Sequence, residues 1–131
     1  MANAELLKGL RALVVDDDAA SAKLVSVVLR GEGCEVEIAP NAEDALTTLV
    51  SFRPDFIVLD LILPLMSGLL LAQRLKADPA TRKIVIIALT VVNGPEAERA
   101  TRDAGCSAYF RKPLDPLSFP ERVLECLDGA L

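Results

Sequence analysis

Short apolar segments recur along the chain, separated by longer segments that carry apolar residues at helical spacing. Most of the short segments end at a polar or turn-forming residue, which predicts strands buried on both faces of a sheet. The predicted strands are Ala12–Val15, Glu35–Ala39, Phe56–Leu59, Ile84–Leu89 and Ala108–Arg111. The second of these alternates polar and apolar residues, so we expect it at an edge of the sheet or half-buried.

A helix is predicted after each strand. Asn41, three residues before Asp44, is a suitable N-cap for the second helix, and Ser118 and Glu121 have the spacing of a capping box for the last. The predicted helices cover about Ala19–Arg30, Ala42–Ser51, the residues from Gly68 to Ala77, Glu96–Ala104, and the stretch from Ser118 to Asp128. Five strands alternating with five helices predict an α/β fold, with a parallel sheet covered on both faces.

The length of 131 residues is typical of one domain, and the sequence contains no internal repeat, low-complexity segment or linker. We therefore expect a single domain over residues 1–131, with its core at about residues 10–128 and residues 1–9 as an N-terminal extension. The start of the chain lacks the pattern of a signal peptide. The longest apolar segment, Phe56–Leu71, is too short and too interrupted to span a bilayer. We expect a cytoplasmic protein that does not act at a membrane.

Composition and charge exclude several kinds of site. The net charge of −5 and the pI of about 4.7 disfavour direct binding of nucleic acid, which usually needs a basic face. The chain has no histidine, which excludes histidine-based catalysis and most zinc sites. Its three cysteines are odd in number and contain no CxxC pair, so reduced thiols are the plainest expectation.

Polar residues follow four of the predicted strands directly. Asp16 and Asp17 follow the first, Asp60 the third, Thr90 the fourth and Lys112 the fifth. The carboxyl ends of parallel strands meet at one edge of a sheet, which is where open α/β sheets bind their ligands. Carboxylates gathered there repel one another unless a cation joins them, and Mg²⁺ suits such a site because it prefers oxygen ligands.

This set of side chains predicts phosphoryl chemistry. An aspartate between a metal ion and a lysine is a good phosphoryl acceptor, because phosphoryl transfer needs mainly positioning and neutralisation of charge. The sequence has no Walker loop and no GxGxxG, so a bound nucleotide is not the expected donor. Taken alone, the acidic run Asp16–Asp18 is more often a solvated loop and helix N-cap, and the prediction depends on the whole set.

The motifs resemble those of the receiver domain of two-component response regulators, over residues 10–128. The matching segments are LVVDDD at Leu13–Asp18, VLDLILPLMSG at Val58–Gly68, ALT at Ala88–Thr90 and AYFRKP at Ala108–Pro113. The resemblance implies a flavodoxin-like doubly wound (βα)5 fold with strand order 2-1-3-4-5. It also implies that Asp60 is the phosphoacceptor. Magnesium would then be held by Asp16, Asp17, Asp60 and the backbone carbonyl of Ile62.

The resemblance also implies a switch. Thr90 would be the hydroxyl that moves toward the phosphoryl group, Lys112 would pair with that group, and Tyr109 would be the aromatic switch residue. The Lys112–Pro113 bond is typically cis in this family. Output would pass through the surface formed by the fourth helix, the fifth strand and the fifth helix. A simpler alternative for Tyr109 is a half-buried strand residue whose hydroxyl reaches water.

The sequence departs from the usual family pattern beside the acceptor. Ile62 stands two residues after Asp60, where many receivers have a polar side chain, and Val91 and Val92 follow Thr90, where a small residue is usual directly after the threonine. We hypothesise that these apolar side chains hinder attacking water and give a long-lived phosphoprotein. The alternative is that they only fill space.

The segment after Asp60 holds more apolar residues than one buried helix face needs. These are Leu65, Met66, Leu69 and Leu70. We consider two alternatives: an exposed patch for a partner or a homodimer, or a cover over the sheet.

Three functions remain open from the sequence. The first is a response regulator phosphorylated by a sensor histidine kinase or a histidine phosphotransfer protein, which signals to a downstream effector protein and is not an enzyme. The second is an interaction module of the same fold that works without phosphorylation. The third is a small aspartyl-phosphate phosphatase, which would need an acid at position 62, where the chain has Ile62.

Overall fold

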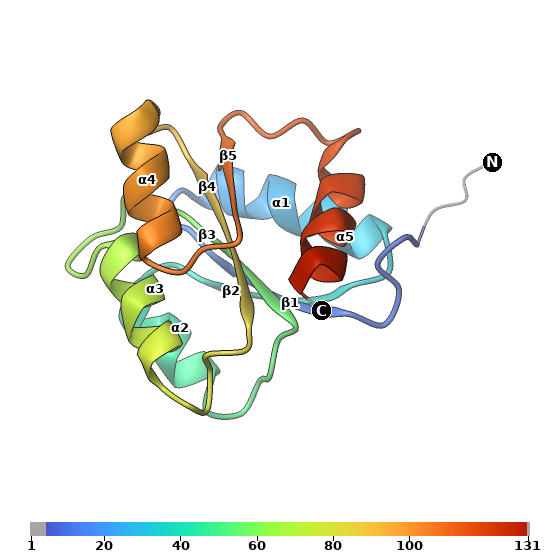
Figure 1. Ribbon diagram of the computed structural model, residues 1–131. Coiled ribbons are helices and arrows are strands. Elements are labelled where there is room, and N and C mark those ends of the chain that lie inside the picture. Colours follow the sequence, from blue (N-terminus) through green and yellow to red (C-terminus); the bar gives the residue numbers. More distant parts are fainter. Residues whose placement is uncertain (1–4, 131) are drawn as a thin grey trace.

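Five parallel strands form one sheet in the order β2-β1-β3-β4-β5, which confirms the predicted flavodoxin-like topology. The structure is a computed structural model that describes residues 5–130, with side chains for residues 5–128 (Figure 1). The strands are β1 Arg11–Val15, β2 Glu35–Ala39, β3 Phe56–Leu59, β4 Val85–Thr90 and β5 Ala108–Arg111. The helices are α1 Ala19–Gly31, α2 Ala42–Thr48, α3 Gly68–Ala77, α4 Pro95–Asp103 and α5 Phe119–Ala130. Within this part of the chain, no helix has the length and apolar character needed to cross a membrane.

The helices cover both faces of the sheet and enclose two apolar layers. One layer packs α2, α3 and the end of α4 on the face that carries Leu13 and Val15. The other packs α1 and α5 on the face that carries Ala12 and Val14. This alternation follows from the two-residue period of a strand, and it explains why all of β3, and β1 after Arg11, are apolar. β2 lies at an edge of the sheet, as predicted, although its burial alternates only over Glu35–Glu37 and Ile38 is exposed.

The end of α2 and the start of α5 differ from the prediction for identifiable reasons. α2 ends at Thr48 rather than Ser51, because the chain leaves the helix through turns that bring Phe52 into the core. Before α5 the Ser118 hydroxyl donates to Asp115 Oδ2 at 2.9 Å, so Asp115 organises the turn that leads into the helix. The capping box expected from Ser118 and Glu121 is therefore replaced by a turn three residues earlier.

The segment before β1, expected as an extension outside the core, contributes a core side chain. Leu7 is fully buried, and its backbone N–H donates to the carbonyl of Glu32 at 3.1 Å. The Cys34 thiol donates in turn to the carbonyl of Leu7. Residues 5–10 thus close the end of the sheet that lies opposite the carboxyl ends of the strands.

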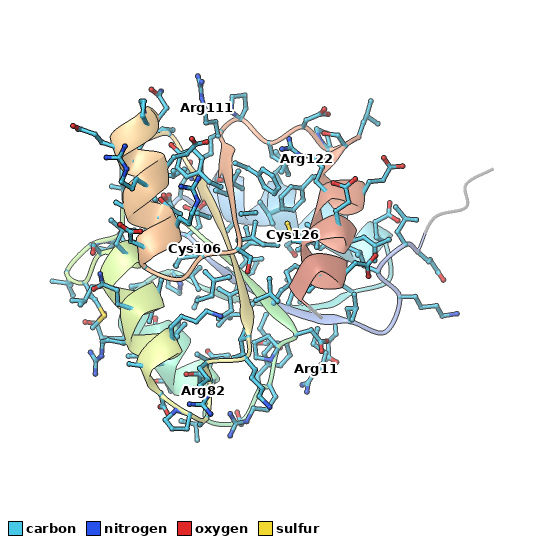
Figure 2. All side chains as sticks on the ribbon, viewed as in Figure 1. Arg11, Arg82, Cys106, Arg111, Arg122 and Cys126 are labelled. Atoms are coloured by element: carbon cyan, nitrogen blue, oxygen red, sulfur yellow. The ribbon has the colours of Figure 1, made fainter. Side chains whose placement is uncertain are left out.

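The three cysteines are free thiols. Cys106 packs in the layer beneath α2 and α3, and Cys126 packs against the layer beneath α1 and α5, so they lie on opposite sides of β5 (Figure 2). Burial raises the pKa of Cys34 and of Cys106 to about 11. These thiols are therefore protonated packing groups at neutral pH.

Candidate functional site

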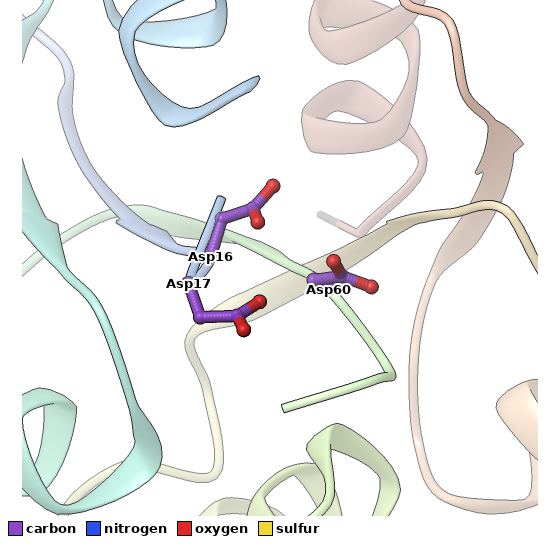
Figure 3. A group of neighbouring side chains, drawn as sticks. All are labelled: Asp16, Asp17 and Asp60. Atoms are coloured by element: carbon purple, nitrogen blue, oxygen red, sulfur yellow. The ribbon is translucent and has the colours of Figure 1, made fainter. Parts of the chain in front are cut away.

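The predicted acidic residues meet at the carboxyl edge of the sheet. Asp16 follows β1 and Asp60 follows β3, and the backbone N–H of Asp60 donates to the carbonyl of Val15 at 2.9 Å. This bond continues the pairing of β1 with β3 by one step and fixes the two acids side by side. One carboxylate oxygen each from Asp16, Asp17 and Asp60 lies within 4.8 Å of the others (Figure 3). Asp16 and Asp60 are buried, whereas Asp17 is exposed.

Lys112 neutralises the two buried acids. Its Nζ donates to Asp16 Oδ2 at 2.8 Å and to Asp60 Oδ2 at 2.9 Å, so a residue after β5 contacts the residues after β3 and β1. Burial alone lowers the pKa of this ammonium, but the hydrogen bonds and charges of the two acids outweigh burial and raise the pKa above its usual value. The following Lys112–Pro113 peptide bond is cis, as the family resemblance implied.

Backbone donors hold the second oxygen of each buried acid. The N–H of Asp18 donates to Asp16 Oδ1 at 2.9 Å, and the N–H of Ile62 donates to Asp60 Oδ1 at 3.1 Å. Asp18 itself caps α1 by accepting from the N–H of Ala20. Asp16 and Asp17 therefore belong to the acidic cluster, whereas Asp18 lies at the amino end of α1, where a carboxylate is favourable.

Thr90 and Tyr109 hold the same residue of the segment that follows β4. The N–H of Val92 donates to the buried hydroxyl of Thr90 at 3.3 Å, and the Tyr109 hydroxyl donates to the carbonyl of Val92. The Tyr109 hydroxyl therefore has a protein partner, which argues against the simpler expectation that it reaches water. Thr90 is also joined to β5, because its carbonyl accepts from the N–H of Lys112 at 2.9 Å.

Gly68 begins α3 directly against the backbone of the acceptor residue. A Cβ atom at this position would lie 2.2 Å from the carbonyl oxygen of Asp60 and 2.7 Å from the Cα of Leu61. The N–H of Gly68 donates to the carbonyl of Leu61 at 3.0 Å, which closes the turn. The absence of a side chain therefore allows α3 to approach the segment that carries Asp60.

The apolar residues beside the acceptor are largely exposed. Ile62 is 54% exposed and Val91 is 62% exposed. Neither side chain fills the core, which argues against the expectation that they only fill space. Among the residues after Asp60, Leu65 and Leu70 are exposed, whereas Met66 and Leu69 pack partly against the core. Half of this segment therefore covers the sheet, and a role of the exposed half in binding a partner or a second copy stays a prediction.

The donor atoms at this edge fit a magnesium ion. Three carboxylates converge, one of them exposed and without a hydrogen bond from Lys112, and oxygen is the ligand atom that Mg²⁺ prefers. The buried pair is already partly neutralised by the Lys112 ammonium, which leaves net negative charge in the cluster to attract a divalent cation. Asp16, Asp17 and Asp60 are the side chains that would hold the ion.

Two contributors to the site have no side-chain signal in the sequence. The main chain of Val92 links Thr90 to Tyr109, and the N–H of Ile62 holds Asp60. Main-chain groups are present at every position, so only the folded geometry identifies those that act here. Gly68 does carry a signal, namely a glycine at the start of a helix where a better helix former would be expected.

Comparisons with known proteins agree with this geometry. The family model described as the response regulator receiver domain matches residues 12–124. The DNA-binding response regulator MtrA of Mycobacterium tuberculosis is 38% identical over 117 residues, which cover 86% of this chain and 48% of the relative. The response regulator PleD of Caulobacter vibrioides is 34% identical over 113 residues, which cover 86% of this chain and 25% of the relative. The chain thus spans half or less of the length of these relatives.

Solved structures are similar over nearly the whole chain. A putative response regulator from Chloroflexus aurantiacus has a TM-score of 0.87 and 35% identity, covering 92% of this chain and 99% of that one. A CheY-like response regulator receiver domain protein from Methanospirillum hungatei has a TM-score of 0.84 and 30% identity, covering 92% and 95% respectively. Together with the family match, these similarities establish that the chain belongs to the response regulator receiver domain family of two-component signalling.

Proposed function

We propose that Asp60 is the phosphoacceptor of a receiver that relays a two-component signal. The observation that carries the proposal is the bridging position of Lys112, whose Nζ binds both Asp16 and Asp60 while Asp17 completes the cluster. An acid held beside a fixed ammonium and two further carboxylates has the charge environment that an acyl phosphate needs. A purely structural ion pair would not require the third, exposed acid.

The proposed transfer uses the chain's own groups in defined roles. A carboxylate oxygen of Asp60 attacks the phosphorus of the donor, the new O–P bond forms as the donor's P–N bond breaks, and the electron pair leaves on the imidazole nitrogen. The Lys112 ammonium stabilises the negative charge on the oxygens bound to phosphorus. When bound by Asp16, Asp17, Asp60 and the carbonyl of Ile62, magnesium would supply further neutralisation of the phosphoryl oxygens.

The proposed switch depends on Val92, whose main chain is hydrogen-bonded to the hydroxyls of both Thr90 and Tyr109. If the Thr90 hydroxyl turns toward a phosphoryl group, the N–H of Val92 loses its acceptor. The segment that Tyr109 binds is then free to rearrange together with α4 and β5. Phosphorylation would thereby bias the surface formed by α4, β5 and α5 between two arrangements that a downstream effector protein can distinguish.

The partners proposed are a sensor histidine kinase or a histidine phosphotransfer protein as donor and an effector protein as target, so the chain is a signalling module rather than an enzyme. A phosphatase is disfavoured because the exposed side chain at position 62 is apolar where that chemistry needs an acid. Direct binding of nucleic acid by this chain is disfavoured by its net charge of −5.

Intact-mass spectrometry tests the proposal. The protein is incubated with magnesium and acetyl phosphate beside Asp60→Asn, and we expect the mass of one phosphoryl group to be gained by the native chain and absent from the variant. Lack of a gain in a folded protein that binds magnesium would refute phosphoacceptor function and support the phosphorylation-independent module instead.

A further inference from the structure

A groove between α2 and α3 lies away from the phosphorylation site and from the α4–β5–α5 surface. The two helices lie side by side on one face of the sheet (Figure 1). The groove has a volume of about 240 Å³. Its floor is apolar, and its rim carries two arginines. The lining residues that matter here are Leu46, Leu49, Val50, Arg53, Arg74 and Leu75.

Apolar side chains reach solvent in this groove and on the surface beside it, where Val50 is a lining residue and Leu70 precedes the lining residue Arg74 by one helical turn. Val50, just after α2, is 80% exposed, and Leu70 on α3 is 46% exposed. Leu70 and Arg74 are four residues apart on α3 and therefore lie on the same face of that helix. Leu65, three residues before the start of α3, is 92% exposed. Leu65 and Leu70 are two of the four apolar residues after Asp60 that one buried helix face does not need, and neither packs in the core.

The two arginines of the groove lack acidic partners. Within the described part of the chain, no carboxylate lies within 4.0 Å of Arg53 or Arg74. Arg53 donates to the carbonyl of Ala80, and Arg74 contacts the sulfur of Met66. The one acid that lines the groove, Asp78, accepts from the N–H of Ala80. Two guanidinium groups therefore face solvent with most of their donors free, in a chain whose net charge is −5.

We propose that the α2–α3 groove is a docking site for an acidic amphipathic segment of a partner protein. Apolar side chains of the partner would cover Val50 and Leu70, and its carboxylates would pair with Arg53 and Arg74. The planar guanidinium fork matches a carboxylate in two hydrogen bonds, and apolar contacts flanked by such pairs are typical of binding sites for helical segments. The attraction is local to the two arginines, and a second copy of this chain is the alternative occupant that the dimer measurement below decides.

A titration with a designed peptide tests this site without phosphorylation. The probe is a helical peptide with leucines at positions i, i+4 and i+7 flanked by glutamates, and its matched control has lysines in place of the glutamates. The ¹⁵N-labelled Asp60→Asn protein is used, so that failure of the docking proposal is separate from failure of the phosphoacceptor proposal. We expect saturable chemical-shift changes centred on Val50, Arg53, Leu70 and Arg74 with the glutamate peptide only.

Variants then distinguish binding through charge pairs from nonspecific apolar binding. Arg53→Gln combined with Arg74→Gln should weaken binding by about tenfold, because charge-assisted hydrogen bonds are lost. Arg102→Gln, at an exposed position of α4, should leave binding unchanged. Absence of saturable shifts, equal binding of the lysine peptide, or shifts centred outside the groove would overturn the proposal. A concentration-dependent dimer abolished by Val50→Asp would overturn it in favour of a second copy.

Discussion

Gly68→Ala places one methyl group between α3 and the backbone that carries the phosphoacceptor. Its Cβ would lie 2.2 Å from the Asp60 carbonyl oxygen, where ordinary contact begins at 3.4 Å, so α3 or the acceptor segment must move by about 1 Å. The atoms in the way belong to the backbone of Asp60 and Leu61, which cannot turn aside as a side chain can. The displacement therefore reaches the residue that Lys112 and Ile62 hold in place.

Two opposing effects determine the magnitude. Alanine is favoured over glycine in helices by at most about 1 kcal/mol, and less at a first helical position. Overpacking against a rigid backbone costs about 1–3 kcal/mol, so we expect a net loss in the free energy of unfolding. The effect on chemistry should be larger, because a displacement of about 1 Å at a reacting group can cost on the order of a hundredfold in rate.

Gly31→Ala provides the matched control, because a Cβ at the end of α1 meets nothing within 4 Å. Urea unfolding should show Gly68→Ala less stable than the native chain and Gly31→Ala as stable or slightly more stable. Stopped-flow phosphorylation by a small phosphodonor with magnesium should be slowed only in Gly68→Ala. If Gly68→Ala matched the native chain in both assays, the argument that close approach of α3 positions Asp60 would be wrong.

Three further predictions concern packing, phosphoryl lifetime and a buried thiol. Leu7→Ala should lower the free energy of unfolding by about 2–5 kcal/mol, because Leu7 is fully buried. Leu6→Ala, at a position that is 43% exposed, should lower it far less. Equal urea midpoints for the two variants would contradict this prediction. Ile62→Asn and Val91→Ala should each hasten loss of the phosphoryl group by about tenfold, equivalent to about 1.4 kcal/mol of barrier, and unchanged decay in both would reject the shielding hypothesis. Burial raises the pKa of Cys34 to about 11, so the folded state keeps a proton on this thiol at a pH where the unfolded state has lost it. The free energy of unfolding should therefore fall between about pH 9 and pH 11, and it should fall less in Cys34→Ala. Chemical denaturation across this range measures the difference.

The fold was largely predictable because its signals are local and repeated. The predicted bounds of all five strands lie within one residue of the observed ones. The signal was clearest for the central strands β1, β3 and β4, because burial on both faces demands apolar side chains. The edge position of β2 was visible in its alternation. Helix ends were less predictable. Before α5, either Ser118 or Asp115 could accept hydrogen bonds from the turn, and the sequence does not show that Asp115 accepts from Leu117 and Ser118 instead.

The segment before β1 illustrates a different limit. Leu6 and Leu7 have the same chemistry in the sequence, yet Leu6 is 43% exposed and Leu7 is fully buried. Both backbone N–H groups donate to Glu32, between α1 and β2, but only the Leu7 side chain packs into the apolar layer beneath α1 and α5, which is a long-range contact. Local patterning carries no information about such a contact.

The sequence by itself determined which residue types stand at the ends of the strands, and therefore that acids, a hydroxyl and a lysine meet at one edge of a parallel sheet. This was possible because strand ends are local features and parallel strands bring them together. Only the tertiary structure decided that Lys112 bridges Asp16 and Asp60 and that one residue, Val92, connects Thr90 to Tyr109. It also decided that Arg53 and Arg74 border one groove. These are distances between side chains and main-chain groups remote in sequence, and packing of the whole chain sets them.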